Sequence, residues 1–277
     1  MKIKKRDINL YDTLFSGQCF RMFLEEDSSF TIVIKDRVIN IKEEGDFLVI
    51  DSDKLENLEN VVIEYLDLNR DYDFINKELS KRSNLIKNNL NLINGYKILK
   101  QDPFEMYISY IISQNNKVSK IQSSIDIICK KFGKKVIFRN KEYYLFPTFE
   151  ELKDITYDDL KEAKVGFRDK YIINALNAIK YDKNFLENIK NMPSDEAINR
   201  LCSVKGIGLK VASCILLFGY SRMDVYPIDT WVKKYVVDNY GVKDNINVIR
   251  KLMKEEFGNS SALAIQYFFH INRNKTN

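Results

Sequence analysis

The pattern of hydrophobic and polar positions changes character about one third of the way along the chain. Residues 30–34, 37–41 and 47–50 are short runs rich in β-branched and aromatic residues, separated by polar turns. These runs predict an antiparallel β-meander. From about residue 55 onward the apolar positions recur with a helical period, and strand-like runs almost disappear. We therefore expect an α+β protein, with an antiparallel sheet near the N-terminus and a mostly helical remainder.

Capping residues divide the helical part of the chain into elements. The Asp-Pro pair at 102–103 predicts a helix start, because aspartate is a good N-cap and proline suits the first helical position. Caps and turns predict further helices from a capping box at 148–151, over 167–179 and over 193–204. The best boundary between two domains lies near residues 95–102. We therefore expect an N-terminal α+β domain over 1–100 and a helical domain over 101–277.

The composition is that of an ordinary globular protein. The chain has 277 residues, of which 45% are hydrophobic and 30% are charged, so it is long enough to bury a large core. No apolar run approaches the ~18–20 residues that span a bilayer. No apolar signal-peptide core follows the basic N-terminus. We expect an intracellular monomer that is neither secreted nor bound to a membrane; if the source is a prokaryote, its place is the cytoplasm or nucleoid.

The charge distribution and the few cysteines and histidines limit the partners and the kinds of catalysis that this chain can have. Residues 101–277 carry 28 basic and 21 acidic groups, a net of +7, whereas residues 1–100 carry 16 and 18, a net of −2. A polyanionic partner would face the second part, although an ordinary solvated surface has the same composition. Four widely spaced cysteines and the single His270 argue against a zinc site, an iron–sulfur cluster or a Ser–His–Asp triad. Catalysis would then depend on Lys, Asp, Glu, Tyr or Cys.

A turn with two glycines joins two predicted helices. The first helix ends at Val204 and the second starts near Leu209. Gly206 and Gly208 permit a tight turn between them. Amides exposed at the start of the second helix can bind a phosphate without any side-chain charge. The alternative is a plain connection between two helices, which two glycines do not exclude.

A lysine and an aspartate near this turn are the candidate catalytic residues. Lys210 lies at the start of the helix after the turn, and Asp229 follows Pro227 at the expected N-cap of the next helix. If that helix packs back on the turn, an amine and a carboxylate meet in one cleft. Taken separately, Lys210 is an ordinary surface lysine and Asp229 an ordinary cap.

Together these segments resemble the helix-hairpin-helix, Gly-Pro-Asp superfamily of DNA base-excision glycosylases, in the turn at 204–210 and the Pro-x-Asp segment at 227–229. Further segments resemble the 8-oxoguanine DNA glycosylases and occur in that family's order: Leu-Phe-Ser-Gly-Gln-Cys-Phe-Arg at 14–21, Ser-Gln-Asn-Asn at 113–116 and Val-Gly-Phe-Arg-Asp-Lys-Tyr at 165–171. The resemblance implies a bifunctional DNA glycosylase/AP lyase. Such an enzyme excises 8-oxoguanine from double-stranded DNA through a lysine Schiff base and cuts the strand by β-elimination, with no cofactor and no metal.

The resemblance also implies roles around the lesion. Lys210 is the expected nucleophile at the sugar C1′, and Asp229 is expected to stabilise the positive charge that develops on the sugar. The Gly17 carbonyl would accept the hydrogen that 8-oxoguanine carries on N7, where guanine has an acceptor. The expected lesion pocket is completed by Cys214 and Phe269 on the two faces of the base, Phe218 nearby, and Gln266 at the Watson–Crick edge. A gap-free alignment puts Ile265, and not Gln266, at that last position.

A second group of residues is expected at the gap that the extruded base leaves in the duplex. Asn115 would fill the gap, and Phe167 would wedge beside the unpaired base. Arg168 and Lys120 align with two arginines that read the opposite cytosine in the family. Because lysine lacks the planar fork of arginine, we expect Lys120 to relax the preference for cytosine.

A third group is expected to hold the DNA backbone. The candidates for phosphate contacts are Gly206, Gly208, Val211 and Lys233, with Lys234 beside it. Trp231 stands where the family often has a phosphate-binding histidine, and it is equally expected to be a core residue. Two other functions stay open: a related glycosylase for another damaged purine, which would not need Lys210 as a nucleophile, and a non-catalytic DNA-binding module.

Overall fold

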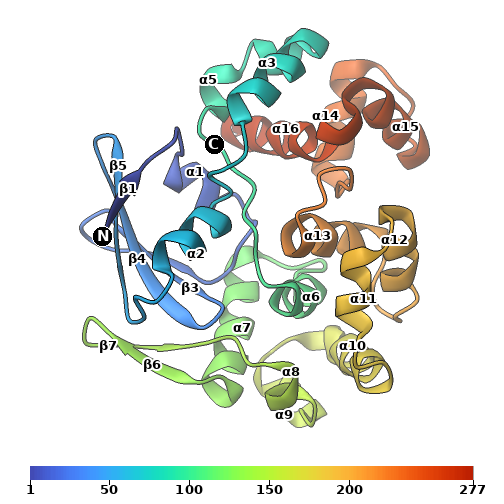
Figure 1. Ribbon diagram of the computed structural model, residues 1–277. Coiled ribbons are helices and arrows are strands. Elements are labelled where there is room, and N and C mark those ends of the chain that lie inside the picture. Colours follow the sequence, from blue (N-terminus) through green and yellow to red (C-terminus); the bar gives the residue numbers. More distant parts are fainter. Residues whose placement is uncertain (277) are drawn as a thin grey trace.

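A five-stranded antiparallel sheet flanks a larger helical body in the computed structural model, which describes residues 1–276 (Figure 1). The strand order is β1-β5-β4-β3-β2. The strands are β1 (Lys2–Lys4), β2 (Met22–Leu24), β3 (Phe30–Ile34), β4 (Arg37–Glu44) and β5 (Phe47–Ser52). The predicted meander is confirmed as β3, β4 and β5. The two edge strands were not predicted, because three residues are too few to reveal an alternating pattern.

Both faces of the sheet are covered. On one face α1 (Leu10–Leu14) and α2 (Leu58–Tyr65) share a buried apolar cluster with the strands. On the other face Val33 and Val38 pack against Phe138 of a second hairpin, formed by β6 (Lys135–Phe138) and β7 (Lys141–Tyr144). The expectation that strands disappear after residue 55 is therefore wrong for this hairpin. Its turn residues Arg139 and Asn140 have φ values of 50° and 61° without a glycine, so the usual hairpin signal is missing.

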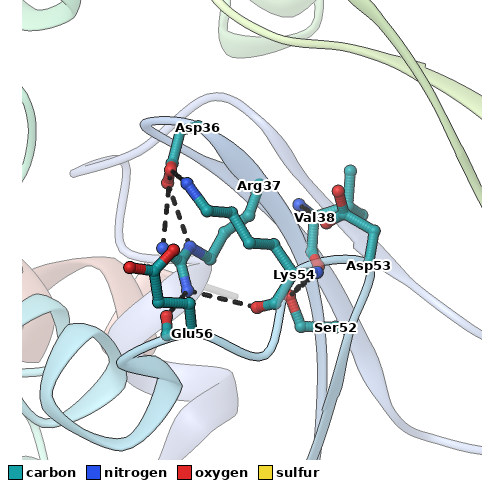
Figure 2. A network of polar contacts seen from close by, with 7 residues as sticks. All are labelled: Asp36, Arg37, Val38, Ser52, Asp53, Lys54 and Glu56. Atoms are coloured by element: carbon teal, nitrogen blue, oxygen red, sulfur yellow. Dashed lines mark hydrogen bonds and ion pairs between the residues drawn. The ribbon is translucent and has the colours of Figure 1, made fainter.

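A buried arginine ties the β3–β4 turn to the segment that leads into α2 (Figure 2). Arg37 donates from Nη1 to the carbonyls of Lys54 at 3.1 Å and Glu56 at 2.6 Å. Its Nε donates to Asp36 Oδ1 at 3.0 Å. Because these carbonyls lie outside the sheet ladder, the guanidinium supplies the hydrogen bonds that the turn and the segment would otherwise lack.

The rest of the chain is mainly helical and surrounds a buried central helix, α6 (Figure 1). α6 contacts α7, α10 and α13. The longer helices are α3 (Tyr72–Arg82), α6 (Pro103–Ile112), α7 (Val118–Phe132), α10 (Asp169–Tyr181), α12 (Ser194–Cys202), α13 (Leu209–Tyr220), α14 (Thr230–Tyr240), α15 (Ile246–Phe257) and α16 (Ser261–Thr276). The shorter ones are α4 (Asn84–Lys87), α5 (Leu90–Ile93), α8 (Phe149–Leu152), α9 (Tyr157–Glu162) and α11 (Phe185–Asn191), with 3₁₀ turns at Gly166–Arg168 and Gly258–Ser260.

The predicted helix starts are confirmed. The Asp102 carboxylate accepts hydrogen bonds from the amides of Phe104 and Glu105 at the start of α6. The capping box of Thr148 and Glu151 is present, although the helix that follows it, α8, has only four residues. None of the helices formed by residues 1–276 combines the length and apolar character needed to cross a membrane.

The division into domains over 1–100 and 101–277 stays a prediction. α3 contacts α15, and both α4 and α5 contact α16, so helices that precede residue 100 pack with the C-terminal helices. Figure 1 shows this group above the sheet. Their apolar residues belong to the large cluster of the helical body, and the sheet has its own smaller cluster.

A buried ion pair lies where the sheet meets the helical body. Arg21 precedes β2, and its Nη1 lies 3.9 Å from Oε2 of Glu105 on α6. The guanidinium also donates to the carbonyl of Tyr144 on β7. Burial raises the pKa of Glu105 to about 7, with the positive charge of Arg21 opposing the shift and the charge of Asp102 adding to it. A pair of this kind makes the joint between the two parts sensitive to pH.

Candidate active site

The glycine turn between α12 and α13 has the geometry that the sequence predicts. Gly206 has a φ of +107°, and a Cβ there would lie 2.3 Å from Cγ of Tyr171, so both conformation and space require glycine. Gly208 is the N-cap of α13 and has open space where a side chain would project. The first intrahelical bond runs from the amide of Ala212 to Gly208, which leaves the amides of residues 209–211 pointing out of the helix start. Val211 has a buried side chain, so only its amide is available to a phosphate.

The charges of Lys210 and Asp229 both affect the pKa of one buried thiol, that of Cys214. Lys210 is exposed at the second position of α13, and Cys214 lies one turn further along the same helix. Asp229 is the N-cap of α14, where Oδ1 accepts a hydrogen bond from the amide of Val232 at 2.8 Å. Burial raises the pKa of Cys214 to about 12, with the charge of Lys210 opposing the shift and that of Asp229 adding to it. Both charges therefore lie near enough to Cys214 to affect its pKa, and a direct contact between the amine and the carboxylate stays a prediction.

The Gly17 turn presents an unused carbonyl. Gly17 lies in the turn after α1 with a φ of +87°, and nothing lies within 4 Å of the position that a Cβ would occupy. Its carbonyl accepts no hydrogen bond from the residues that the structure describes. Gly17 is also partly exposed, and an unused backbone oxygen of such a residue is available to a hydrogen-bond donor from outside the chain.

Two tyrosines join the Gly17 turn to the helices that carry the other predicted pocket residues. Tyr110 on α6 donates from Oη to the carbonyl of Gln18 at 3.2 Å, and its ring stacks on Phe218 of α13 with centroids 5.5 Å apart. Tyr96 donates from Oη to Oε1 of Gln266 on α16 at 3.3 Å. Two of the predicted lesion residues, Phe218 and Gln266, thus each contact a buried tyrosine.

The predicted pocket residues differ in exposure. Cys214, Phe218 and Gln266 are buried, and Phe269 is partly buried on α16. Ile265 is completely buried in the apolar cluster of the helical body, whereas the Gln266 amide oxygen accepts the Tyr96 hydrogen bond. Gln266 thus carries the polar group near this position, and its contact with a base stays a prediction.

The turn between α6 and α7 holds the predicted gap residue. Asn115 is exposed and has a φ of +47°, a conformation that asparagine tolerates better than most residues. Arg168 has only 6% of its surface exposed and donates to three carbonyls of two turns: from Nε to Gln114 at 2.8 Å, from Nη1 to Val165 at 2.8 Å, and from Nη2 to Asn115 at 3.0 Å. The Arg168 guanidinium therefore supports the backbone of the gap turn. Its contact with an opposite cytosine stays a prediction.

The gap turn is also joined to the hairpin and to an exposed aromatic ring. Gln114 donates from Nε2 to the carbonyl of Gly206 at 3.0 Å, which links the α6–α7 turn to the α12–α13 turn. The ring of Phe167 is half-exposed beneath the Arg168 guanidinium, 4.4 Å from ring centroid to Cζ. Hydrogen bonds thus join three turns that are far apart in sequence.

The comparisons with known proteins decide the family. Residues 1–107 match the family model of the 8-oxoguanine DNA glycosylase N-terminal domain. An 8-oxoguanine glycosylase/lyase of Clostridium acetobutylicum, solved with double-stranded DNA containing cytosine opposite 8-oxoguanine, is 36% identical to this chain with a TM-score of 0.93. The match covers 100% of this chain and 99% of that one. The chain belongs to the 8-oxoguanine DNA glycosylase family.

Other members of this glycosylase family agree. The protein MBOgg1, solved in complex with a low-affinity DNA ligand, is 35% identical with a TM-score of 0.93 over 99% of this chain and 94% of that chain. The N-glycosylase/DNA lyase of Saccharomyces cerevisiae is 27% identical over 283 residues, which cover 91% of this chain and 73% of that protein. The expected α+β fold of the family is the fold observed.

Two residues that were expected to depart from the family pattern are both exposed in this glycosylase. Lys120 lies in the first turn of α7. Trp231 lies two residues after Asp229, and 58% of its surface is exposed, so the expectation of a core residue is wrong. Nearby, Nζ of Lys233 lies 2.7 Å from Oδ1 of Asp244. This ion pair reduces the positive charge that Lys233 can offer to a phosphate. The neighbouring Lys234 is exposed.

Sequence reasoning missed the residues that hold this glycosylase site in shape. Gln18, Tyr110 and Gln114 connect the turns, yet none was singled out from the sequence. Gln18 and Gln114 do lie inside the segments that resemble the family, which is the only signal that pointed to them. Among residues 1–276, no group of three or more His, Cys, Asp or Glu side chains is arranged to hold a metal ion.

Proposed function

We propose that this chain removes 8-oxoguanine from duplex DNA and then cuts the strand at the resulting site. One observation carries the proposal. The charges of Lys210 and Asp229 both affect the Cys214 thiol of α13, and Tyr110 joins the same helix to the Gly17 turn. These contacts support one site for a nucleophile, a stabilising carboxylate and a base-reading carbonyl.

The chemical step uses Lys210 as a free amine. Nζ attacks C1′ of the damaged nucleotide, the bond from C1′ to the base breaks, and the base leaves with the bonding electrons. The Asp229 carboxylate stabilises the positive charge that develops on the sugar. The sugar ring then opens: the C1′–O4′ bond breaks, O4′ takes a proton to become the C4′ hydroxyl, and the bond between C1′ and Nζ becomes the double bond of the Schiff base. This Schiff base makes a hydrogen on C2′ acidic, so that β-elimination breaks the C3′–O bond.

Recognition of the lesion depends on one hydrogen atom. 8-Oxoguanine carries a hydrogen on N7, which the Gly17 carbonyl accepts, whereas guanine presents a lone pair there that the carbonyl repels. In a site without water the mismatch of two acceptors is costly. Cys214 and Phe269 would cover the two faces of the base with Phe218 beside them, and Gln266 would contact its Watson–Crick edge.

Turns and helix N-termini would make the contacts that bind the DNA duplex. The α13 amides after Gly208 would bind a phosphate, and Lys233 and Lys234 add positive charge nearby. Asn115 would occupy the gap left by the extruded base, with Phe167 against the unpaired partner. Unstacking a base costs a few kcal/mol, which these contacts would offset.

The function is tested by incubating the protein with duplexes that contain 8-oxoguanine, guanine or an alkylated purine at one position. We expect release of 8-oxoguanine and cleavage of that strand only. Release of the alkylated purine without strand cleavage would favour a related monofunctional glycosylase. Binding of all three duplexes without release of any base would favour a non-catalytic DNA-binding module.

A further inference from the structure

Gln18 follows Gly17 directly and is one of the most buried polar side chains in the chain, with 1% of its surface exposed. Both ends of its amide are used. Oε1 accepts a hydrogen bond from the amide of Leu99 at 2.9 Å, and Nε2 donates to the carbonyls of Lys97 at 2.8 Å and Thr13 at 3.3 Å. These bonds fix the side chain to α1 and to the extended segment that leads into α6.

The backbone of Gln18 is held as well. Its carbonyl accepts from Nε2 of Gln101 at 2.8 Å and from Oη of Tyr110 at 3.2 Å. Gln18 is therefore fixed through its side chain and through its main chain, by residues of three segments: α1, the extended segment before α6, and α6 itself. Such doubly held residues keep one backbone orientation, because any rotation leaves several buried groups without partners.

Gly17 has none of these constraints of its own. It has no side chain, and its carbonyl accepts no hydrogen bond from the described residues. The carbonyl carbon of Gly17 is bonded directly to the nitrogen of Gln18, and the peptide group between them is planar. The direction of the Gly17 oxygen is consequently determined from the Gln18 side of that peptide.

We propose that Gln18 is a positioning residue for lesion recognition, which sets the direction of the Gly17 carbonyl toward N7 of the extruded base. The inference rests on the proposed function, because it assigns a task within the same site. A hydrogen bond weakens steeply when its geometry departs from linearity, so a rotated carbonyl loses both its attraction for 8-oxoguanine and its repulsion of guanine. Gln18 does not touch the reacting atoms, and it has no part in the chemistry of Lys210.

The test separates recognition from chemistry. Cleavage of a preformed abasic site needs Lys210 but no base in the pocket, whereas excision of 8-oxoguanine needs both. Gln18→Met keeps the length of the side chain and removes its hydrogen bonds. Tyr110→Phe is a milder second variant, since it removes one bond to the Gln18 carbonyl and keeps the ring on Phe218.

Two variants serve as matched controls. Tyr107→Phe removes a hydroxyl from α6, the helix that also carries Tyr110. The Tyr107 Oη donates to the Ala175 carbonyl at 3.3 Å. Asn40→Leu removes a buried amide whose Nδ2 donates to Ser29 at 2.8 Å and Thr31 at 3.2 Å within the sheet. Both controls lose buried hydrogen bonds outside the Gly17 turn, so they report the effect of destabilisation alone.

We expect Gln18→Met to slow excision of 8-oxoguanine about tenfold or more and Tyr110→Phe to slow it several-fold, as for the loss of buried hydrogen bonds. Cleavage of abasic DNA should stay within about twofold of wild type, and both controls should leave the ratio of the two rates unchanged. Equal losses of both activities in Gln18→Met and Tyr110→Phe, or unchanged excision in both, would overturn the role of Gln18. Failure of the wild type to release 8-oxoguanine would instead overturn the proposed function, and the Gln18 assignment with it.

Discussion

The two sides of the candidate site are held in different ways. On the Gly17 side, a buried glutamine amide and the buried Tyr110 support the turn, and Gln18 itself is almost fully enclosed. On the opposite side, Lys210 is exposed at a helix start and Asp229 is partly exposed at another. Reading the position of one hydrogen needs a fixed acceptor, whereas attacking a sugar needs an accessible amine. The difference suggests that recognition is built from buried hydrogen bonds and catalysis from the open ends of helices.

The largest expected effect is on the catalytic side. Asp229→Asn keeps an N-cap, because asparagine caps as well as aspartate, but it removes the charge. We expect the excision rate to fall about 10²–10³-fold with an unchanged melting temperature. Asp71→Asn is the matched control, because Asp71 caps α3 by the same single bond, from the amide of Phe74 at 2.9 Å. An excision rate close to that of wild type would remove Asp229 from the chemistry.

A second variant addresses the recognition side. Gly17→Ala places a methyl group in the open space beside the turn and strains the backbone at a φ of +87°. Gly45→Ala is matched, since Gly45 also has a positive φ of +57° and open space around it. Both variants should lose about 1 kcal/mol of stability.

Only Gly17→Ala should slow release of 8-oxoguanine, by about tenfold or more, while cleavage of abasic DNA continues. Single-turnover rates on the two substrates measure this split. Equal behaviour of the two alanine variants would show that the open space at Gly17 is not where the base lies.

A third variant tests the predicted contact of Lys120 with the base opposite the lesion. With Lys120 in place of arginine, we expect similar excision rates opposite all four bases. Lys120→Arg should raise the preference for cytosine about fivefold, because the planar fork of arginine makes paired hydrogen bonds. Lys117→Arg, at an exposed position of the same turn, should change nothing. Strong selectivity for cytosine in the wild type would contradict the assignment.

The smallest expected effect on activity concerns the buried pair of Arg21 and Glu105, which lies where the sheet meets the helical body. Burial raises the pKa of Glu105 from its ordinary value of 4.5 to about 7, so the folded state holds this proton more tightly than the unfolded state does. The contribution to stability is therefore complete below about pH 4.5 and is lost as the pH rises to about 7. Glu105→Gln keeps a neutral group at every pH. Its stability relative to wild type should rise by about 2–3 kcal/mol between pH 5 and pH 8.

Thermal unfolding at a series of pH values measures that difference. Glu59→Gln, at an exposed position of α2, is the control and should show no such trend. A constant difference between Glu105→Gln and wild type from pH 5 to pH 8 would mean that Glu105 is ionised throughout that range.

The sequence predicted the elements that carry strong local signals. Alternating apolar runs predicted β3 to β5, and the caps at Asp102 and Thr148 predicted the starts of α6 and α8. The edge strands and the β6–β7 hairpin were missed because their strands are short and their turn lacks glycine. Local signals of this kind are absent wherever pairing with distant segments decides the structure.

The same limit applies to the site. Lys210 and Asp229 could be named from a turn and a cap, both of which are local features. The bonds of Gln18 reach residues about 80 positions away, as its contact with Lys97 shows (a separation of 79), and no sequence pattern indicates them. The bonds of Arg168 to a turn 53–54 residues distant, and the exposure of Trp231, likewise depend on how the helices pack.

The most direct test of the account is borohydride trapping on a duplex that contains 8-oxoguanine. Wild type, Lys210→Gln and the control Lys205→Gln, an exposed lysine in the same hairpin, would be compared. We predict a covalent protein–DNA product from wild type and from Lys205→Gln, and none from Lys210→Gln. Release of the base by wild type without a trapped product, or a trapped product that persists in Lys210→Gln, would contradict the central claim.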